Sequence, residues 1–199
     1  MSDGDRRTPP LPPLASAPLG SRPTESPIDA RTRRIHSQVD RKGSGLIARN
    51  RARLHCKVGC AACCVDGITV FELEADRIRV MHPELLRAGQ PHLAGACALL
   101  DETGACRVYA DRPYVCRTQG LPLRWIDRGP DGVGEAEYRD ICPLNELALE
   151  PIEALARTDC WSIGPVEEAL RALQASLDGG AERRVALRDL FAEGGLPIP

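Results

Sequence analysis

The chain has 199 residues and a formal net charge of −2, so its overall charge gives no reason to expect a nucleic acid or an acidic membrane as a partner. It has no apolar run long enough to span a bilayer and no signal-peptide pattern at its start, so we expect a cytoplasmic protein. Its length predicts one domain with tails, but large apolar side chains are scarce while nine residues are Cys, so the core needs additional support.

The first residues predict a tail followed by a helix. Residues 1–27 contain seven Pro and no apolar periodicity, which predicts a disordered segment. Ser26 followed by Pro27 is typical of a helix N-terminus. A thin apolar stripe continues this helix to residue 54, although we expect Gly43 and Gly45 to break or loosen it.

The segment that follows the tail is strongly basic. Residues 28–57 contain nine Lys or Arg against Asp29 and Asp40, while the rest of the chain is acidic. Such a helix could bind RNA or an acidic protein, but no aromatic residues are interleaved with the charges. We therefore favour a helix that lies on the acidic body of its own protein.

Thr69 to Glu72 read as a capping box, which predicts a helix from there to His82 and Pro83. On this helix Glu74 falls in the middle of the apolar face. A carboxylate aimed at the core needs a cation, hydrogen-bond donors or a metal to offset its desolvation.

Two hairpins and two helices are predicted downstream. The first hairpin covers residues 97–109, and the second pairs 121–127 with 135–141 around Gly129–Gly132. An amphipathic helix follows Pro165 and stops at Gly179 and Gly180, and a last helix covers about 182–192. The fold class is therefore α+β: a small, irregular, cysteine-rich core with two β-hairpins, flanked by helices.

The cysteines indicate metal rather than disulfides. Their number is odd, no export signal is present, and Cys63 and Cys64 are adjacent, so a cystine framework is disfavoured. Thiolates are soft anionic ligands that suit zinc and iron–sulfur clusters, and four complete either kind of site. The candidate metal ligands are eight: Cys56, Cys60, Cys63, Cys64, Cys97, Cys106, Cys116 and Cys142.

Eight thiolates could form two four-ligand sites or one larger cluster with bridging thiolates. Adjacent side chains tend to diverge, so we expect Cys63 and Cys64 to address different metal atoms. Cys160, beside Trp161, is expected to be a small buried hydrophobic residue.

The pattern of these residues resembles the YkgJ-type cysteine-cluster family, also described as the CxxCxxCC zinc- or iron-chelating domain. The resemblance covers about residues 54–150. It comprises the group Cys56–Cys64, Glu74 on a helix, Cys97, the block Cys106–Arg117 and Cys142. The spacing from Cys56 to Cys60 is one residue longer than the family pattern. The resemblance implies chelation of zinc or of iron, including iron–sulfur, without an assigned activity.

Several polar residues near these cysteines have two interpretations. Glu74 could be an oxygen ligand or an acid–base group, but we favour an ion pair with Arg112 or Arg117. Those arginines could instead hold backbone carbonyls or neutralise thiolates. His55 could substitute as a ligand, although we expect an exposed neighbour. We expect the other three His to be surface or capping residues, and Tyr109 to pack in the first hairpin.

The domain organisation that follows has four parts: a tail over 1–27, a basic helical segment over 28–53, a cysteine-cluster domain over 54–150 and a C-terminal helical extension over 151–199. We expect iron–sulfur or iron centres with a redox or catalytic role. The alternatives are a zinc-stapled structural module and a metal storage or delivery protein. Expected partners are metal ions and an unidentified redox or protein partner, with no nucleic acid and no membrane.

Overall fold

The computed structural model describes residues 26–192 apart from 58, 129–133, 147–149, 178 and 180. Residues 1–25 of the tail predicted over 1–27 lie outside the described residues, and Pro27 already begins α1. The α-helices are α1 (Pro27–Arg49), α2 (Glu72–Met81), α3 (Pro83–Ala88), α4 (Tyr114–Thr118), α5 (Pro143–Glu146), α6 (Pro165–Ala175) and α7 (Asp189–Ala192). The strands are β1 (Thr69–Phe71), β2 (Leu123–Arg128), β3 (Glu135–Asp140), β4 (Trp161–Ser162) and β5 (Arg184–Ala186). The fold is α+β, as the sequence predicted.

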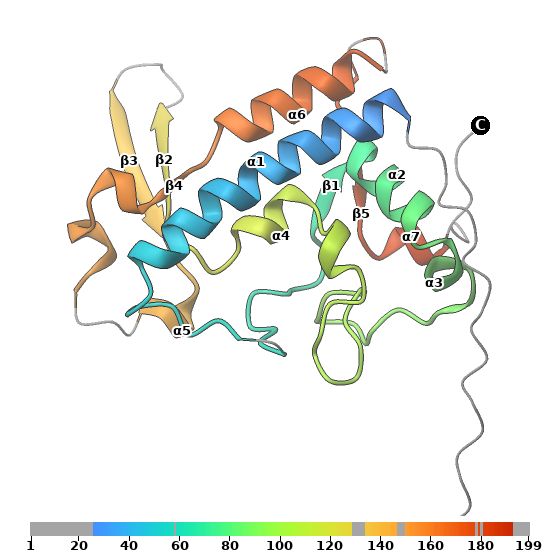
Figure 1. The fold of residues 1–199 in the computed structure, drawn as a ribbon, viewed down its shortest axis with the longest axis horizontal. Helices are drawn as coiled ribbons and strands as arrows, with labels where there is room; N and C mark the ends of the chain where they lie inside the picture. Colours follow the sequence, from blue (N-terminus) through green and yellow to red (C-terminus); the bar gives the residue numbers. More distant parts are fainter. Residues whose placement is uncertain are drawn as a thin grey trace, which may run out of the picture.

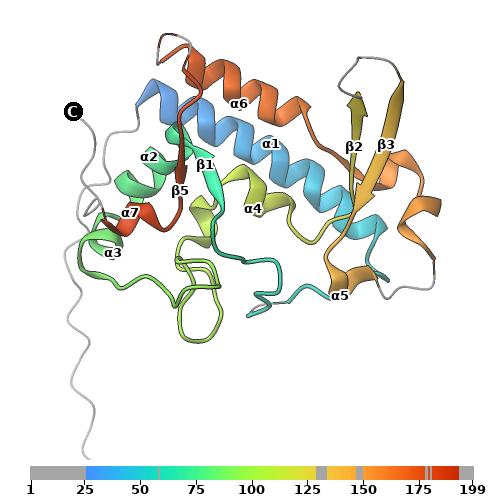
Figure 2. The same cartoon turned by 180° about the vertical axis from the view of Figure 1, so that it is seen from behind.

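The long helix α1 is the axis of the molecule, with α6 along one side and α4 and α2 along the other (Figures 1 and 2). It begins as predicted: the Ser26 hydroxyl accepts the Asp29 N–H at 3.1 Å, and Pro27 occupies the first turn. The expected break at Gly43 and Gly45 is wrong, because the helix continues to Arg49. Val39 and Leu46, each 1% exposed, pack on either side of the glycines, so tertiary contacts carry the helix through them.

Two small sheets lie toward opposite ends of α1 (Figure 1). One has the order β3-β2-β4, and its antiparallel β2–β3 pair confirms the second predicted hairpin. The predicted turn of that hairpin, Gly129–Gly132, lies outside the described residues. The other sheet pairs β1 with β5, with Thr69 opposite Ala186.

The sheet formed by β1 and β5 corrects two predictions. The capping box at Thr69 is wrong, because Thr69 begins a strand, and α2 starts at Glu72 without a side-chain cap. The last helix is shorter than predicted, since residues 184–186 form β5 and only 189–192 are helical. Both errors have the same physical cause: strands of three residues are fixed by a partner more than a hundred residues away.

The first predicted hairpin, residues 97–109, is a compact loop rather than two strands. Its antiparallel pairing is a single bridge between Leu100 and Cys106. Asp101 holds the turn, because its carboxylate accepts the N–H groups of Thr103 and Ala105 at 2.8 and 2.9 Å. The pairing that was predicted is therefore present at one position, which is enough to bring the two ends of the loop together.

The buried side chains form two apolar clusters. The first surrounds α2 and α7 and includes Ile78, Leu99 and Leu190, and the second lies between α1 and α6 around Trp161 and Leu170. Within the part of the chain that the structure describes, no helix is both long and apolar enough to cross a membrane.

Candidate metal centre

The eight candidate cysteines fall into two groups that occupy different environments. Four of them, here called the closed group, pack against the first apolar cluster: Cys64, Cys97, Cys106 and Cys116. The other four, the open group, come from the loop before β1 and from the start of α5: Cys56, Cys60, Cys63 and Cys142. In Figure 1 the cyan loop that contains residues 56–64 lies between α5 and the loop that contains Cys106.

Backbone pairing brings the closed group together from three distant segments. The Cys97 N–H donates to the Cys64 carbonyl at 2.9 Å, beside an antiparallel bridge between Val65 and Ala96. The bridge from Leu100 to Cys106 then folds the 97–109 loop back on itself. Cys116 is brought in by α4, so its position depends on how that short helix is held.

The thiols of the closed group are near enough to influence one another electrostatically. Burial is the largest cause that raises the pKa of Cys116 to about 12, and negative charge on Cys97 and Cys106 contributes to the same shift. Burial is also the largest cause of the raised pKa of Cys97 and of Cys106. Desolvation thus opposes thiolate formation here, and a bound cation is the natural way to offset it.

Arg188, which precedes α7, binds the two backbone segments that contain Cys64 and Cys97. Its guanidinium Nε lies 2.9 and 3.0 Å from the two Asp66 carboxylate oxygens. Its Nη atoms donate to the carbonyls of His92 at 2.8 Å and of Ala96 at 2.9 Å. One side chain from the end of the chain therefore joins the segment after Cys64 to the loop before Cys97.

Glu74 lies in the interior as predicted, but its predicted partners are wrong. It is 3% exposed, and its Oε1 accepts the Tyr114 N–H at 2.7 Å and lies 2.8 Å from His36 Nε2. Arg117 instead pairs with Asp40 at 2.6 Å. His36, expected at the surface or at a cap, is 2% exposed because it faces this carboxylate.

Arg112 and Arg117, which belong to the block Cys106–Arg117, donate to backbone carbonyls. This was one of the two interpretations offered by the sequence. Arg112 donates to the Tyr109 carbonyl at 2.8 Å, and Arg117 donates to the Ala110 carbonyl at 3.0 Å. Tyr109 is 64% exposed, so its expected packing in a hairpin is wrong, and the Arg112 guanidinium lies over its ring at 4.0 Å.

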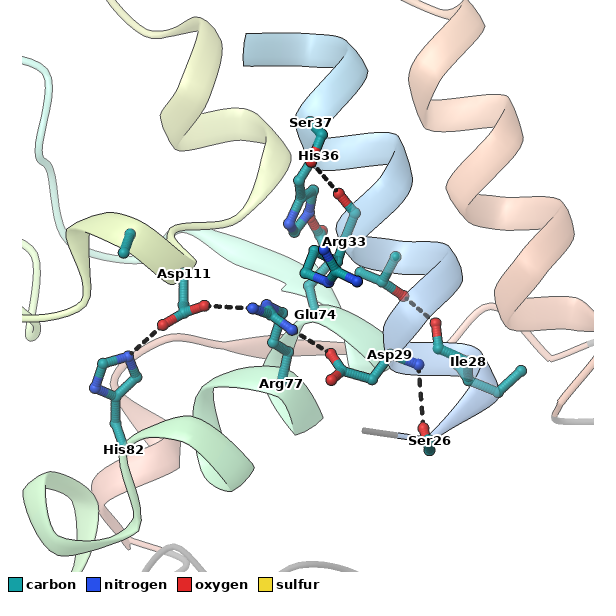
Figure 3. A network of polar contacts seen from close by, with 12 residues as sticks. Ser26, Ile28, Asp29, Arg33, His36, Ser37, Glu74, Arg77, His82 and Asp111 are labelled. Carbon is teal, nitrogen blue, oxygen red and sulfur yellow. Dashed lines mark hydrogen bonds and ion pairs between the residues drawn. The ribbon is translucent and has the colours of Figure 1, made fainter. Parts of the chain in front are cut away.

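A second polar network anchors the turn before Arg112 (Figure 3). Arg77 bridges Asp29 at the start of α1 and Asp111, at 2.5 and 2.6 Å. The other oxygen of Asp111 lies 3.0 Å from His82 Nε2, and His82 also ends α2, so its predicted capping position is confirmed. This network connects the first turn of α1 with the segment that leads to Cys116.

Two cysteines of the open group border a cavity of about 340 Å³. Cys63 and Cys142 line it, together with Gly120, Asp140 and Glu146 and with apolar side chains that include Val65 and Ile141. A Cβ at Gly120, whose φ is +86°, would stand 2.8 Å from Cys56 Sγ. Only glycine therefore allows the Cys56 thiol to approach the cavity wall here.

Asn145 connects the two parts of the open group. It is 1% exposed, and its amide Nδ2 donates to the Gly120 carbonyl at 2.8 Å and lies 3.4 Å from Cys56 Sγ. Its Oδ1 accepts the His55 N–H at 2.8 Å, and its own N–H donates to the Cys142 carbonyl at 2.7 Å. His55 itself is exposed, as expected.

The adjacent pair Cys63 and Cys64 connects the two groups. The two thiols are close enough to influence each other's ionisation, and whether they bind different metal atoms stays a prediction. Their mutual interaction lowers the pKa of Cys63 to about 6 and raises the pKa of Cys64. Nevertheless, Cys63 borders the cavity while Cys64 packs with the apolar cluster, so the pair marks the boundary between the groups.

The donor set suits a soft metal, although its geometry is looser than that of a loaded site. All nine cysteines are free thiols rather than cystines, and Cys160 is buried as expected, with 4% exposed. Among residues 26–192, with the gaps given above, no three Cys, His, Asp or Glu side chains stand in an arrangement that could already hold an ion. Thiolates of this number and softness match zinc and iron chemistry.

Comparison with known families supports this chemistry. Residues 55–131 match the family model CxxCxxCC, described as "Putative zinc- or iron-chelating domain". This segment is similar to that family. Seven of the eight candidate cysteines fall inside the matched residues, and Cys142 follows them. No curated protein and no solved structure matches the chain.

Sequence reasoning missed the polar residues that position the two groups. Asn145, Asp66 and Arg188 carried no visible signal, because each acts through backbone groups of a segment that is distant in sequence. The nearest available hint was the Asp66-Gly67 turn directly after Cys64. His36 was assigned to the surface because its partner Glu74 lies 38 residues away.

Proposed function

We propose that the eight cysteines hold two soft-metal centres, a structural one in the closed group and a reactive or exchangeable one in the open group. The single observation that carries this proposal is the difference in surroundings. The closed group packs against an apolar cluster, whereas Cys63 and Cys142 border a cavity of about 340 Å³. The zinc- or iron-chelating family of residues 55–131 supports metal as the ligand.

For the open group we favour iron, as an iron–sulfur cluster. The cavity beside it is about ten times the volume share of one water molecule, which is about 30 Å³. A mononuclear ion would leave most of that space empty, whereas a polynuclear cluster or an added ligand would use it. Such a cluster supplies one-electron redox chemistry when it is bound.

The protein's own contribution at the open group is to hold the thiols and to keep one side accessible. Asn145 fixes Cys56 and Cys142 relative to Gly120 through the hydrogen bonds described above. The charged side chains that line the cavity, Asp140 and Glu146, are both acidic. They favour a cationic or neutral molecule approaching the bound metal through the cavity over an anionic one.

A zinc-stapled module is the second candidate, and the closed group is the observation that favours it. A four-thiolate site inside an apolar cluster is what a structural zinc site requires. It would also explain how a core with few large side chains is stabilised, since metal binding contributes directly to folding. Both candidate functions can be correct if the closed group binds zinc and the open group binds iron.

Anaerobic purification with elemental analysis and visible spectroscopy tests the proposal. We expect a brown protein that contains iron and acid-labile sulfide. A colourless protein with two zinc ions per chain would replace the redox role by the zinc-stapled module. A folded protein without stoichiometric metal would contradict both.

The same sample should be treated with a chelator, because the two groups differ in exposure. We expect metal of the open group to leave first while the helical circular dichroism signal is kept. Loss of the remaining metal should then coincide with loss of that signal. Release of all metal in one phase with the fold intact would argue for storage or delivery instead.

A further inference from the structure

The helix α4 carries Cys116, yet it has no capping side chain of its own. It spans only Tyr114–Thr118, and its N-cap residue Pro113 makes no side-chain hydrogen bond. The first N–H groups of any helix lack partners within it, and a single turn is not stable by itself in water. Something outside α4 must therefore hold its first turn in place.

Glu74 provides that outside contact. Its Oε1 accepts the N–H of Tyr114, the first residue of α4, at 2.7 Å. A carboxylate at a helix N-terminus satisfies an unpaired donor and interacts favourably with the helix dipole. The other end of Tyr114 is fixed as well, because its hydroxyl accepts Trp161 Nε1–H at 3.0 Å.

His36 makes the buried carboxylate tolerable. Its Nε2 lies 2.8 Å from the same oxygen of Glu74, and both side chains are almost fully buried. An isolated carboxylate in this position would be strongly disfavoured. Figure 3 shows His36 of α1 and Glu74 of α2 facing each other. His36 lies outside the matched residues 55–131, so a segment that precedes the family domain completes this contact.

We infer that Glu74, held by His36, is a positioning residue that caps α4 from another helix and thereby places Cys116 in the closed group. The inference builds on the proposed metal centre, because placement matters only if Cys116 is a ligand. Glu74 acts through backbone geometry, so an uncharged side chain with the same acceptor should serve. The Gln side chain has such an acceptor at the same distance from the backbone.

The test is residue-resolved alkylation of the cysteines in the full-length protein as purified. Wild type, Glu74→Ala and Glu74→Gln are treated with iodoacetamide, and the rate at each cysteine is measured by peptide mass spectrometry. Glu72→Ala is the matched control, because Glu72 is 6% exposed on the same helix but pairs with Arg79 at 2.8 Å. The metal content of each sample is measured in parallel.

We expect Glu74→Ala to raise the alkylation rate of Cys116 by about tenfold relative to Cys97, as loss of a helix cap would predict. Glu74→Gln should retain the wild-type ratio, and so should Glu72→Ala. An equal increase at all four closed-group cysteines would overturn the inference, because it would show general destabilisation. A Glu74→Gln variant that behaves like Glu74→Ala would also overturn it, in favour of a role for the charge.

Failure of the inference and failure of the proposed function give different results. Wild-type protein without metal would contradict the metal centre, whereas the ratio of Cys116 to Cys97 alkylation would still report on the cap. Conversely, normal metal content with an unchanged ratio in Glu74→Ala would contradict the positioning role alone.

Discussion

The closed and open cysteine groups are built by different means. The closed group is gathered by backbone pairing and by Arg188, which lies at the far end of the described chain, against an apolar cluster. In the open group, the neutral side chain of Asn145, three residues after Cys142, links the Cys56 segment to the Cys142 segment beside a cavity. The first arrangement ties the C-terminal end of the described chain to the site, while the second joins the loop before β1 to α5 through one side chain.

This difference predicts different consequences for the two groups. The raised pKa values of the closed-group thiols mean that their thiolates are stable only beside a cation, so metal bound there should contribute directly to folding. In the open group, Cys56 and Cys142 are linked by hydrogen bonds of the buried Asn145 that do not require a metal. Stability should therefore follow the closed group, and exchange or reactivity should follow the open one.

The largest expected effect comes from removing one ligand in each group. Cys97→Ala should remove most of the contribution of the closed-group metal, which for a structural four-ligand site is on the order of 10 kcal/mol, and should leave the chain largely unfolded. Cys142→Ala should remain folded while losing the metal of the open group. Chemical denaturation followed by circular dichroism, with elemental analysis, measures both. Equal loss of structure in the two variants would remove the distinction between the groups.

The next largest effect is expected at Asn145. Asn145→Ala removes a fully buried amide and leaves the His55 N–H and the Gly120 carbonyl without a partner, which should cost about 2–4 kcal/mol. The affinity of the open group for its metal should also fall by at least about tenfold, as expected for loss of a group that orients ligands. Denaturant titration and chelator competition measure the two effects. Leu144→Ala, at a side chain that is 46% exposed, is the control and should change neither.

The sequence predicted residues and strands that form the two cysteine groups and their surroundings. It did not predict how these parts are brought together. The cysteines, Glu74 and the strands β2 and β3 were visible because each leaves a local pattern of residue type or period. Strand β5 was predicted as helix because three residues around Val185 show no period of two. Its partner β1 was mistaken for a capping box for the same reason, since Thr69 is fixed by Ala186.

The sequence predicted the division of the cysteines into two groups only in part. The adjacent residues Cys63 and Cys64 indicated two different metal atoms. They did not indicate which of the remaining cysteines would lie beside each of the two. That assignment depends on Arg188 and Asn145, whose contacts reach across 122 and 90 residues of sequence and mostly involve backbone atoms. Backbone carbonyl and N–H groups are the same for almost every residue type. A hydrogen bond to such a group therefore cannot be predicted from a sequence pattern.

A smaller effect is expected when Arg188 is replaced, because this contact is partly exposed to water. Arg188→Gln should leave the chain folded but release the closed-group metal to a chelator about tenfold faster, since the segments before Cys97 and after Cys64 would no longer be joined. Arg184→Gln is the matched control: Arg184 donates to the Thr69 carbonyl at 3.0 Å and contacts no candidate ligand segment. If both variants released metal at the same rate, Arg188 would have no special part in the closed group.

The smallest effect concerns the turn that brings Cys97 and Cys106 together. Hydrogen bonds from Thr103 and from the Ala105 N–H hold the pKa of Asp101 below its usual range, so its ionised form is favoured in the folded state. The resulting stabilisation is present above the pKa of an unfolded Asp, about 4, and is lost as the pH falls through the lower folded value. The difference in urea midpoint between wild type and Asp101→Asn should thus be constant near pH 6 and shrink below about pH 4. Glu102→Gln, at an exposed neighbour, should show no such dependence, and a difference for Asp101→Asn that grew on acidification would contradict this account of the turn.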